Sequence, residues 1–252
     1  MNPSDPSPSH NSARELRHQQ SGEWLLNSWD YTRWKSESGS RLWLCGKAGC
    51  GKTIISSTII EDALMSFRPK INHAVAFFYF RYDFKAEDTR ITQYSHMLRS
   101  LIVQLSRQSQ VPPHKLDELY EQHLDGNRQP SNADLASLFI ELIPIFGRVL
   151  VVLDALDECD DIESLLRFLT DILGKAKGCL GFLVTSRRES KIEESLDEYR
   201  QIRLEERVIE RDIRLFIAYH LAGPDFQQFP PSLKLEIETD LTRKADGMYV
   251  SF

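Results

Sequence analysis

Residues 41–65, RLWLCGKAGCGKTIISSTIIEDALM, decide the fold, because a glycine-rich loop here joins a short apolar run to a helical pattern. The loop at 46–53 (GKAGCGKT) matches the G-x-x-x-x-G-K-[ST] pattern of a phosphate-binding loop. Glycines let successive backbone N–H groups line a concave turn without Cβ clashes. The following helix adds its unpaired N–H groups and the positive end of its dipole. A strand before the motif and a helix after it predict a nucleotide site.

Each loop position has an expected part in binding. The residues predicted to surround the phosphates are Gly46, Lys47, Ala48, Gly49, Cys50, Gly51, Lys52 and Thr53. We expect Lys52 to reach the β- and γ-phosphates and the Thr53 hydroxyl to ligate Mg²⁺. A chain of this length matches the pattern by chance roughly once in a hundred, so coincidence explains the motif poorly.

Composition bounds the class of protein. The chain has 252 residues, of which 41% are hydrophobic and 27% charged, which suits one α/β domain with an appendage. A net charge of −6 argues against a nucleic-acid partner bound through phosphate neutralisation. No signal peptide is recognisable, and the longest apolar run, 149–153, is too short to cross a membrane. The four cysteines have no metal-ligand spacing. We therefore expect a soluble, cytoplasmic protein without a membrane partner.

Five apolar runs are typical of buried strands. They lie at 42–45, 74–82, 149–153, 181–185 and 201–204. Helical patterns separate them, at 54–64, 88–104, 131–146 and 162–173. Ser131 or Asn132 is expected to cap the third of these helices, and Pro144 to kink or end it. The alternation predicts right-handed crossovers and a mostly parallel five-stranded sheet sandwiched by helices.

Acidic residues follow the central run directly. Asp154 ends it, and Asp157 and Glu158 come next. The carboxyl edge of a parallel sheet is where α/β proteins bind ligands, so Asp154 is expected to hold Mg²⁺ and Asp157 or Glu158 to orient the attacking water. The alternative is that Asp157, Asp160 or Asp161 caps the helix at 162–173.

A basic residue follows the fourth run. Arg187 is expected to reach the γ-phosphate and to report its presence. The alternative is an ordinary surface charge beside Arg188.

The lead-in and the C-terminal part complete the predicted organisation. Residues 1–12 are polar and expected to be disordered, whereas Trp24, Trp29 and Trp34 indicate a segment that packs on the domain or covers the nucleobase. We predict a partly disordered lead-in with a Trp-rich helical segment at 1–40 and an NTPase core at 41–205. Helical patterns at 209–221 and 233–245 predict a small helical subdomain at 206–252. This subdomain is expected to be incomplete, because the chain stops within an apolar pattern.

Several motifs together carry a family resemblance. The segments 46–53 (GKAGCGKT), 149–158 (VLVVLDALDE) and 183–187 (LVTSR) resemble the NACHT NTPase family. The resemblance is closest to the nephrocystin-3-like N-terminal domain of fungal NOD-like receptors. The segments 21–26 (SGEWLL), 31–35 (YTRWK), 97–105 (MLRSLIVQL) and 244–249 (KADGMY) share it.

This resemblance implies a function. It implies a signal-transducing P-loop ATPase of the STAND class with an ADP-held off state, an ATP-held homo-oligomeric on state and slow hydrolysis. By position it implies that Lys52 and Thr53 bind phosphate and Mg²⁺ and that Asp154 supports the metal. It likewise makes Asp157 and Glu158 acidic catalytic candidates and Arg187 the sensor.

One departure and three alternatives stand beside this reading. Where related switches have a Gly-x-Pro turn that touches adenine, this chain has Gly247-Met248-Tyr249. An Asn-Lys-x-Asp motif for guanine is missing, which favours ATP and ADP. The alternative functions are a P-loop small-molecule kinase, a helicase-like motor and a scaffold that binds nucleotide without hydrolysing it.

Overall fold

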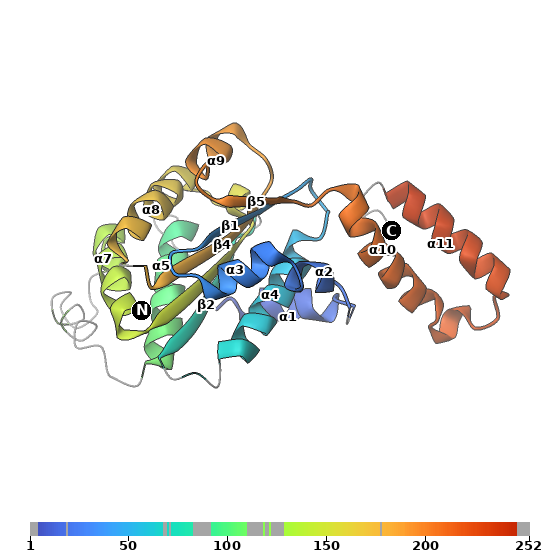
Figure 1. The fold of residues 1–252 in the computed structure, drawn as a ribbon, viewed down its shortest axis with the longest axis horizontal. Coiled ribbons are helices and arrows are strands. Elements are labelled where there is room, and N and C mark those ends of the chain that lie inside the picture. The colour runs from blue at the N-terminus through green and yellow to red at the C-terminus, as the bar shows by residue number, and fades with distance from the viewer. Residues whose placement is uncertain are drawn as a thin grey trace.

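A five-stranded parallel sheet forms the centre of the computed structural model (Figure 1). The structure describes residues 5–18, 20–67, 70, 72–82, 92–109, 118, 121, 129–176 and 178–245. The strands are β1 (Arg41–Cys45), β2 (His73–Tyr79), β3 (Arg148–Asp154), β4 (Leu180–Ser186) and β5 (Arg200–Arg203). Their order is β2-β3-β4-β1-β5, and all neighbouring pairs are parallel. The predicted α/β fold with a five-stranded sheet is confirmed.

Helices cover both faces of this sheet (Figure 1). One layer contains α5 (Gln93–Gln108), α7 (Asn132–Leu142), α8 (Ile162–Lys175) and α9 (Ser190–Ser195). The other contains α1 (Ser7–Glu15), α2 (Glu23–Leu26), α3 (Trp29–Ser36) and α4 (Lys52–Phe67). The C-terminal part consists of α10 (Glu206–Leu221) and α11 (Pro231–Ala245). Short 3₁₀ turns are η1 (Ile143–Ile145), η2 (Leu156–Glu158) and η3 (Pro224–Phe226).

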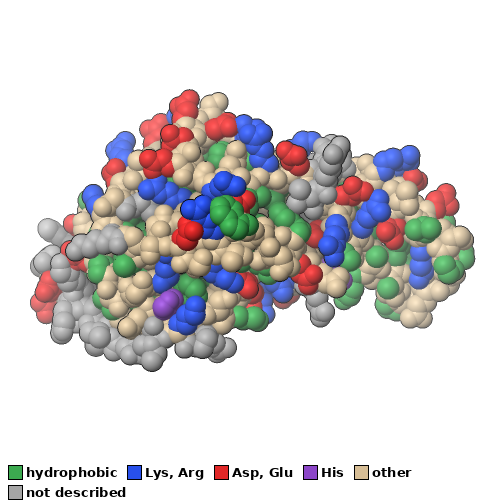
Figure 2. All heavy atoms as spheres, viewed as in Figure 1, with side chains coloured by type: hydrophobic (Ala, Val, Ile, Leu, Met, Phe, Trp, Pro, Cys, Tyr) green, Lys and Arg blue, Asp and Glu red, His purple; other side chains and the backbone are tan. Residues whose placement is uncertain are grey.

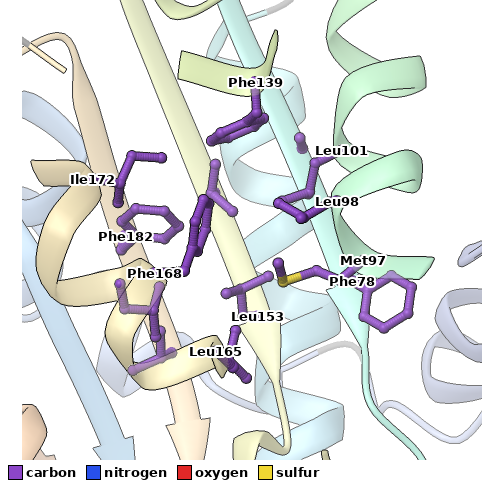
Figure 3. Packing of buried hydrophobic residues seen from close by; sticks show 14 of the residues in the cluster. Phe78, Met97, Leu98, Leu101, Phe139, Leu153, Leu165, Phe168, Ile172 and Phe182 are labelled. Atoms are coloured by element: carbon purple, nitrogen blue, oxygen red, sulfur yellow. The ribbon is translucent and has the colours of Figure 1, made fainter. Parts of the chain in front are cut away.

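Two hydrophobic clusters fill the space between sheet and helices. β3 supplies both, because successive side chains of a strand point to opposite faces. Its odd-numbered residues Val149, Val151 and Leu153 join the first cluster, and Leu150 and Val152 join the second. Figure 3 shows the first cluster, in which side chains of α5, α7 and α8 meet β2, β3 and β4. A strand buried on both faces reads as a continuous apolar run, which is why β3 was recognisable.

Local signals explain where several helices begin and end. Ser131 caps α7 and forms a capping box with Asp134, as one of the two predicted caps. The helix ends at Leu142, and Pro144 lies in η1, as expected for a residue without a backbone donor. Asp161 accepts from the backbone N–H of Ser164 at 3.3 Å and caps α8. Of the three candidates Asp157, Asp160 and Asp161, the cap of α8 is therefore Asp161, and Asp157 lies in η2.

The lead-in differs most from expectation. Residues 7–12 belong to helix α1, so the prediction of disorder for 1–12 is wrong for this part. The segment is polar on average, but His10 and Ala13 are buried against the domain. Tertiary contact, which composition does not reveal, orders this helix. The tryptophans behave differently from one another, since Trp34 is buried and Trp29 is 62% exposed.

Two other boundaries shift. β2 ends at Tyr79, three residues before the predicted end. α5 begins at Gln93, after the N-cap Thr92, and runs to Gln108, beyond the predicted end at 104. The first residues of that prediction, 88–91, lie outside the described part of the chain. So does the turn Gly247-Met248-Tyr249.

α10 and α11 lie side by side at one end of the molecule (Figure 1). α10 contributes Ile209, Ile213 and Ile217 to the second cluster. Its Asp212 also accepts a hydrogen bond from the backbone N–H of Gly22 at 2.8 Å. The division into units at 1–40, 41–205 and 206–252 remains a prediction. Within the described residues, none of the helices has the length and apolar character that crossing a membrane requires.

Candidate nucleotide site

The loop between β1 and α4 has the backbone that its glycines make possible. Gly49 and Gly51 adopt φ values of 72° and 86°, a left-handed region in which a Cβ causes strain. At Gly46 a Cβ would lie 2.6 Å from the Cys50 sulfur and 3.0 Å from Leu204 Cβ. Glycine is therefore required at Gly46 by close packing and at the other two positions by conformation.

Lys52 begins helix α4 and turns back over the loop. Its ammonium donates to the backbone carbonyl of Gly46 at 2.9 Å and to that of Lys47 at 2.8 Å. These contacts hold a positive charge at the centre of the glycine-rich turn. A phosphate group placed there would meet this charge and the N-terminus of α4 together.

Asp154 is the most buried acidic group of the site, with a residue exposure of 2%. Three hydroxyls donate to its carboxylate: Thr53 at 2.7 Å, Ser56 at 2.6 Å and Thr185 at 2.7 Å. Burial raises the pKa of Asp154, and the hydroxyl contacts oppose that rise. The contact with Thr53 brings together the two residues predicted to support Mg²⁺.

Asp157, Glu158 and Arg187 lie at the same edge of the sheet. The Asp157 side chain, 4% exposed, accepts from the Arg187 backbone N–H at 2.9 Å and pairs with Arg187 Nε at 3.1 Å. The Glu158 carboxylate accepts from the backbone N–H of Tyr82 at 2.9 Å. Ala155, in a left-handed conformation with φ of 60°, makes the turn that carries the chain from β3 into η2.

A cavity of about 530 Å³ opens over these groups. Its walls include the loop and most of the residues predicted from the sequence: Ala48, Gly49, Gly51, Lys52, Thr53, Asp154, Asp157, Glu158 and Arg187. Cys50 belongs to the loop but its side chain is buried, and this burial raises the pKa of its thiol. Trp24, Trp29 and Trp34 are not among the described residues that line this cavity.

Sequence reasoning missed two parts of the wall. One is the end of β2, which contributes Tyr79, Phe80 and Arg81. The rule that selected Asp154 did not select Arg81, because the predicted strand at 74–82 included Arg81, whereas β2 ends at Tyr79. The other part is α1, which contributes Pro8, Ser9, Ser12 and Ala13, together with its C-cap Leu16. No pattern in the sequence of α1 points to a ligand.

The donors suit Mg²⁺ better than a softer metal. A hydroxyl and a carboxylate offer hard oxygen ligands, and Mg²⁺ commonly completes its shell with water and substrate phosphates. Within the described residues, His, Cys, Asp and Glu form no group of three or more that could hold a metal ion by protein ligands alone. The residues present thus fit a magnesium ion that arrives with nucleotide.

The sheet order, the glycine-rich loop and the carboxylate at the end of β3 define a P-loop NTPase. The family model described as nephrocystin 3, N-terminal, matches residues 20–187. The chain therefore belongs to the nephrocystin 3 N-terminal family, which confirms the resemblance to a NACHT-like P-loop NTPase. No curated protein sequence matches the chain.

Solved structures show more distant similarity. The Aeropyrum pernix ORC1 protein, solved in complex with DNA, is 11% identical with a TM-score of 0.48, and the match covers 98% of this chain and 58% of that one. Domain III of the Thermotoga maritima replication initiation protein DnaA is 12% identical with a TM-score of 0.45, and the match covers 98% of this chain and 87% of that one. Because both TM-scores are below 0.5, we transfer no function from these proteins.

Proposed function

We propose that the chain binds ATP and ADP together with Mg²⁺ and hydrolyses ATP slowly, as a nucleotide-operated switch. The contact between Thr53 and Asp154 at 2.7 Å carries this proposal. It places a hydroxyl at the start of the phosphate-loop helix against a buried carboxylate, within a cavity of about 530 Å³. Such a pair has the chemistry to hold a hydrated Mg²⁺ beside bound phosphates.

The loop residues 46–53 surround the phosphates in this proposal. Backbone N–H groups of the loop and of the first turn of α4 bind the phosphate oxygens, and Lys52 supplies the charge. When bound, Mg²⁺ neutralises negative charge on the phosphate oxygens. Thr53 and Asp154 hold it, while the chain's other groups act on the attacking water.

The two remaining acids take different parts. Asp157 is already engaged by Arg187, so it is best suited to position the arginine. Glu158 lines the cavity and is held through one oxygen by the Tyr82 backbone. We assign Glu158 to orientation of water and Arg187 to contact with the γ-phosphate.

The switch role rests on family membership together with the acidic balance of the chain. Net charge of −6 favours a nucleotide-operated module over a motor that tracks nucleic acid. In a longer protein of the NOD-like receptor type, the same module would form homo-oligomers through its NTPase when ATP is bound. Stimulation of hydrolysis by a small-molecule acceptor would favour the kinase alternative.

Substitution of Lys52 tests the binding site. Lys52→Ala removes a charge-assisted contact worth about 1.5–3 kcal/mol, so ATP affinity should fall at least about tenfold. Isothermal titration calorimetry with Mg-ATP measures this, and the control Lys191→Ala removes the same charge from an exposed position. Equal affinities for wild type and Lys52→Ala would rule out the assigned site.

A further inference from the structure

Helix α1 forms one wall of the cavity over the phosphate loop. Pro8, Ser9, Ser12, Ala13 and Leu16 all line the cavity. The helix precedes residues 20–187, which the family model matches, so family membership does not account for this wall. A helix that contributes four residues to a ligand cavity, with its C-cap Leu16 as a fifth, is in a position to influence what the cavity holds.

Buried polar contacts hold α1 in place. His10, 6% exposed, has Nδ1 at 2.9 Å from the Tyr79 hydroxyl and Nε2 at 2.9 Å from a Glu61 carboxylate oxygen. Its ring also lies 5.0 Å from the Phe77 ring, centre to centre. Arg14, one turn further along, pairs with Glu61 at 3.5 Å. Side chains of α4 and β2 therefore hold the helix in place.

Both anchoring elements belong to the nucleotide site. Glu61 lies on α4, whose first residues are Lys52 and Thr53. Tyr79 is the register partner of Asp154 across the β2–β3 pair, and it lines the same cavity. The position of α1 is thus coupled through two short paths to the groups proposed to bind phosphate and metal.

The position of the cavity indicates which end of a nucleotide α1 meets. The cavity runs from the loop toward the ends of β2 and β3, where the carboxylates lie, and Arg187, which follows β4, also lines it. In the sheet, β2 and β3 are on the side of β1 opposite to β5, and β5 contributes no described residue to the lining. The space beside α1 therefore continues from the phosphate loop toward the hydrolytic groups.

We propose that α1 closes the terminal-phosphate end of the nucleotide site and favours a nucleoside triphosphate over a diphosphate. Ser9 and Ser12 supply hydroxyls to this wall, and His10 is the positioning residue that holds the helix against α4 and β2. The inference rests on the proposed function, because it requires nucleotide at the loop. It adds a determinant of the ATP/ADP preference outside the phosphate loop and the residues that follow β3 and β4.

A matched pair of substitutions on α1 tests the proposal. Ser12→Trp places a large side chain on the cavity wall, and Asn11→Trp places it on an exposed position that does not line the cavity. With Mg²⁺ present, Ser12→Trp should weaken binding of a non-hydrolysable ATP analogue about tenfold or more. The reason is that the indole occupies cavity volume that the nucleotide needs and must move before the nucleotide binds. Its effect on ADP should be smaller, and Asn11→Trp should leave both affinities unchanged.

Two further measurements do not depend on that pair. In the wild type, backbone amides of residues 7–15 should exchange hydrogen more slowly with the ATP analogue than with ADP, because coupling between helix and ligand is reciprocal. His10→Ala should lower the ratio of ATP-analogue affinity to ADP affinity, because the helix that favours the triphosphate is no longer held in place. A histidine that only stabilised the fold would lower the melting temperature and leave that ratio unchanged.

The outcomes separate the two proposals. If the wild type binds neither nucleotide, the proposed function is wrong. If the wild type binds both, equal effects of Ser12→Trp and Asn11→Trp would overturn the role of α1 alone. Equal exchange of the α1 amides with either nucleotide would overturn it as well.

Discussion

Asp154 meets two opposing demands at the scale of a single residue. Its carboxylate is buried, which disfavours the charged form, yet a metal-binding role requires that form. Hydroxyls of Thr53, Ser56 and Thr185 offset part of the cost. The folded protein therefore carries a carboxylate whose burial costs stability, and the proposed Mg²⁺ would offset that cost.

A comparison of the wild type with Asp154→Asn should reveal this cost as a pH dependence of the wild type's stability that the variant lacks. Because the folded-state pKa is raised above the unfolded value, the wild type loses stability as pH rises from about 4 through the folded pKa. The loss is about 1.4 kcal/mol for each unit by which the pKa is raised, and the asparagine variant avoids it. Denaturant unfolding between pH 4 and 8 measures the difference.

The same variant should bind Mg-ATP more weakly, because it removes the charge of the carboxylate that we propose holds Mg²⁺. Asp197→Asn, at an exposed carboxylate, provides the control. If the stability difference between wild type and Asp154→Asn stays constant over the pH range, burial does not raise the pKa of Asp154.

The two acids of η2 make a second residue-scale prediction. Glu158→Gln should leave ATP affinity near that of the wild type and slow single-turnover hydrolysis by about 10²-fold or more, because it removes the carboxylate proposed to orient the attacking water. Asp157→Asn should instead act through Arg187, changing the ATP/ADP affinity ratio more than the rate. Unchanged hydrolysis in Glu158→Gln would assign the orientation of water to another residue.

At the scale of elements, α5 closes the free edge of β2 with side-chain amides. Gln104 accepts from the backbone N–H of Phe77 at 3.0 Å and donates to its carbonyl at 2.8 Å. Gln108 does the same for Val75 at 3.1 and 2.8 Å. Two glutamines four residues apart on a helix thus match two strand residues two apart, as the backbone of a further strand would.

Removing these amides should destabilise the fold. Gln104→Leu leaves a donor and an acceptor of the β2 backbone without partners, at a cost of about 1–3 kcal/mol in the free energy of unfolding. Gln108→Leu should act in the same direction, and both variants should aggregate more readily. Arg107→Leu, exposed on the same turn, is the control in urea unfolding and light scattering. If Gln104→Leu and Gln108→Leu are as stable as Arg107→Leu, the two amides do not stabilise the fold.

Sequence patterns predicted the strands well because burial on both faces leaves a local record. β3 and β4 are apolar runs with few breaks, and the glycine-rich loop marks the end of β1. α1 left no such record, since its docking depends on His10 meeting Glu61 and Tyr79, which are distant in the chain. Long-range side-chain contacts of this kind have no periodicity to detect.

The candidate site was predictable in the same uneven way. Asp154 could be selected because it directly follows a buried run. The hydroxyls of Ser56 and Thr185 that surround it come from α4 and β4, and nothing in either local pattern marks them as its partners. Likewise the pairing of Asp157 with Arg187 follows from the adjacency of β3 and β4, which spacing alone does not give.

At the scale of the whole molecule, the surface is mixed in charge. Figure 2 shows acidic and basic side chains interspersed over the visible face, in keeping with a net charge of −6. Exposed apolar side chains on α10 and α11 include Tyr219, Leu233 and Leu235. Asp212, buried within α10, ties this helical pair to Gly22 in the lead-in through a hydrogen bond. Motion of the pair relative to the sheet would therefore have to break or carry along this contact.

The sealed margin of β2 limits how copies of this protein can join. Strand addition requires a row of unpaired backbone groups, and at β2 the amides of Gln104 and Gln108 occupy that row. The opposite margin, β5, is only four residues long and bears Arg200 and Arg203, a short charged edge that discourages pairing. A ring or filament of such subunits would therefore form through contacts between helices and loops. The sheets of neighbouring subunits would not join by strand pairing.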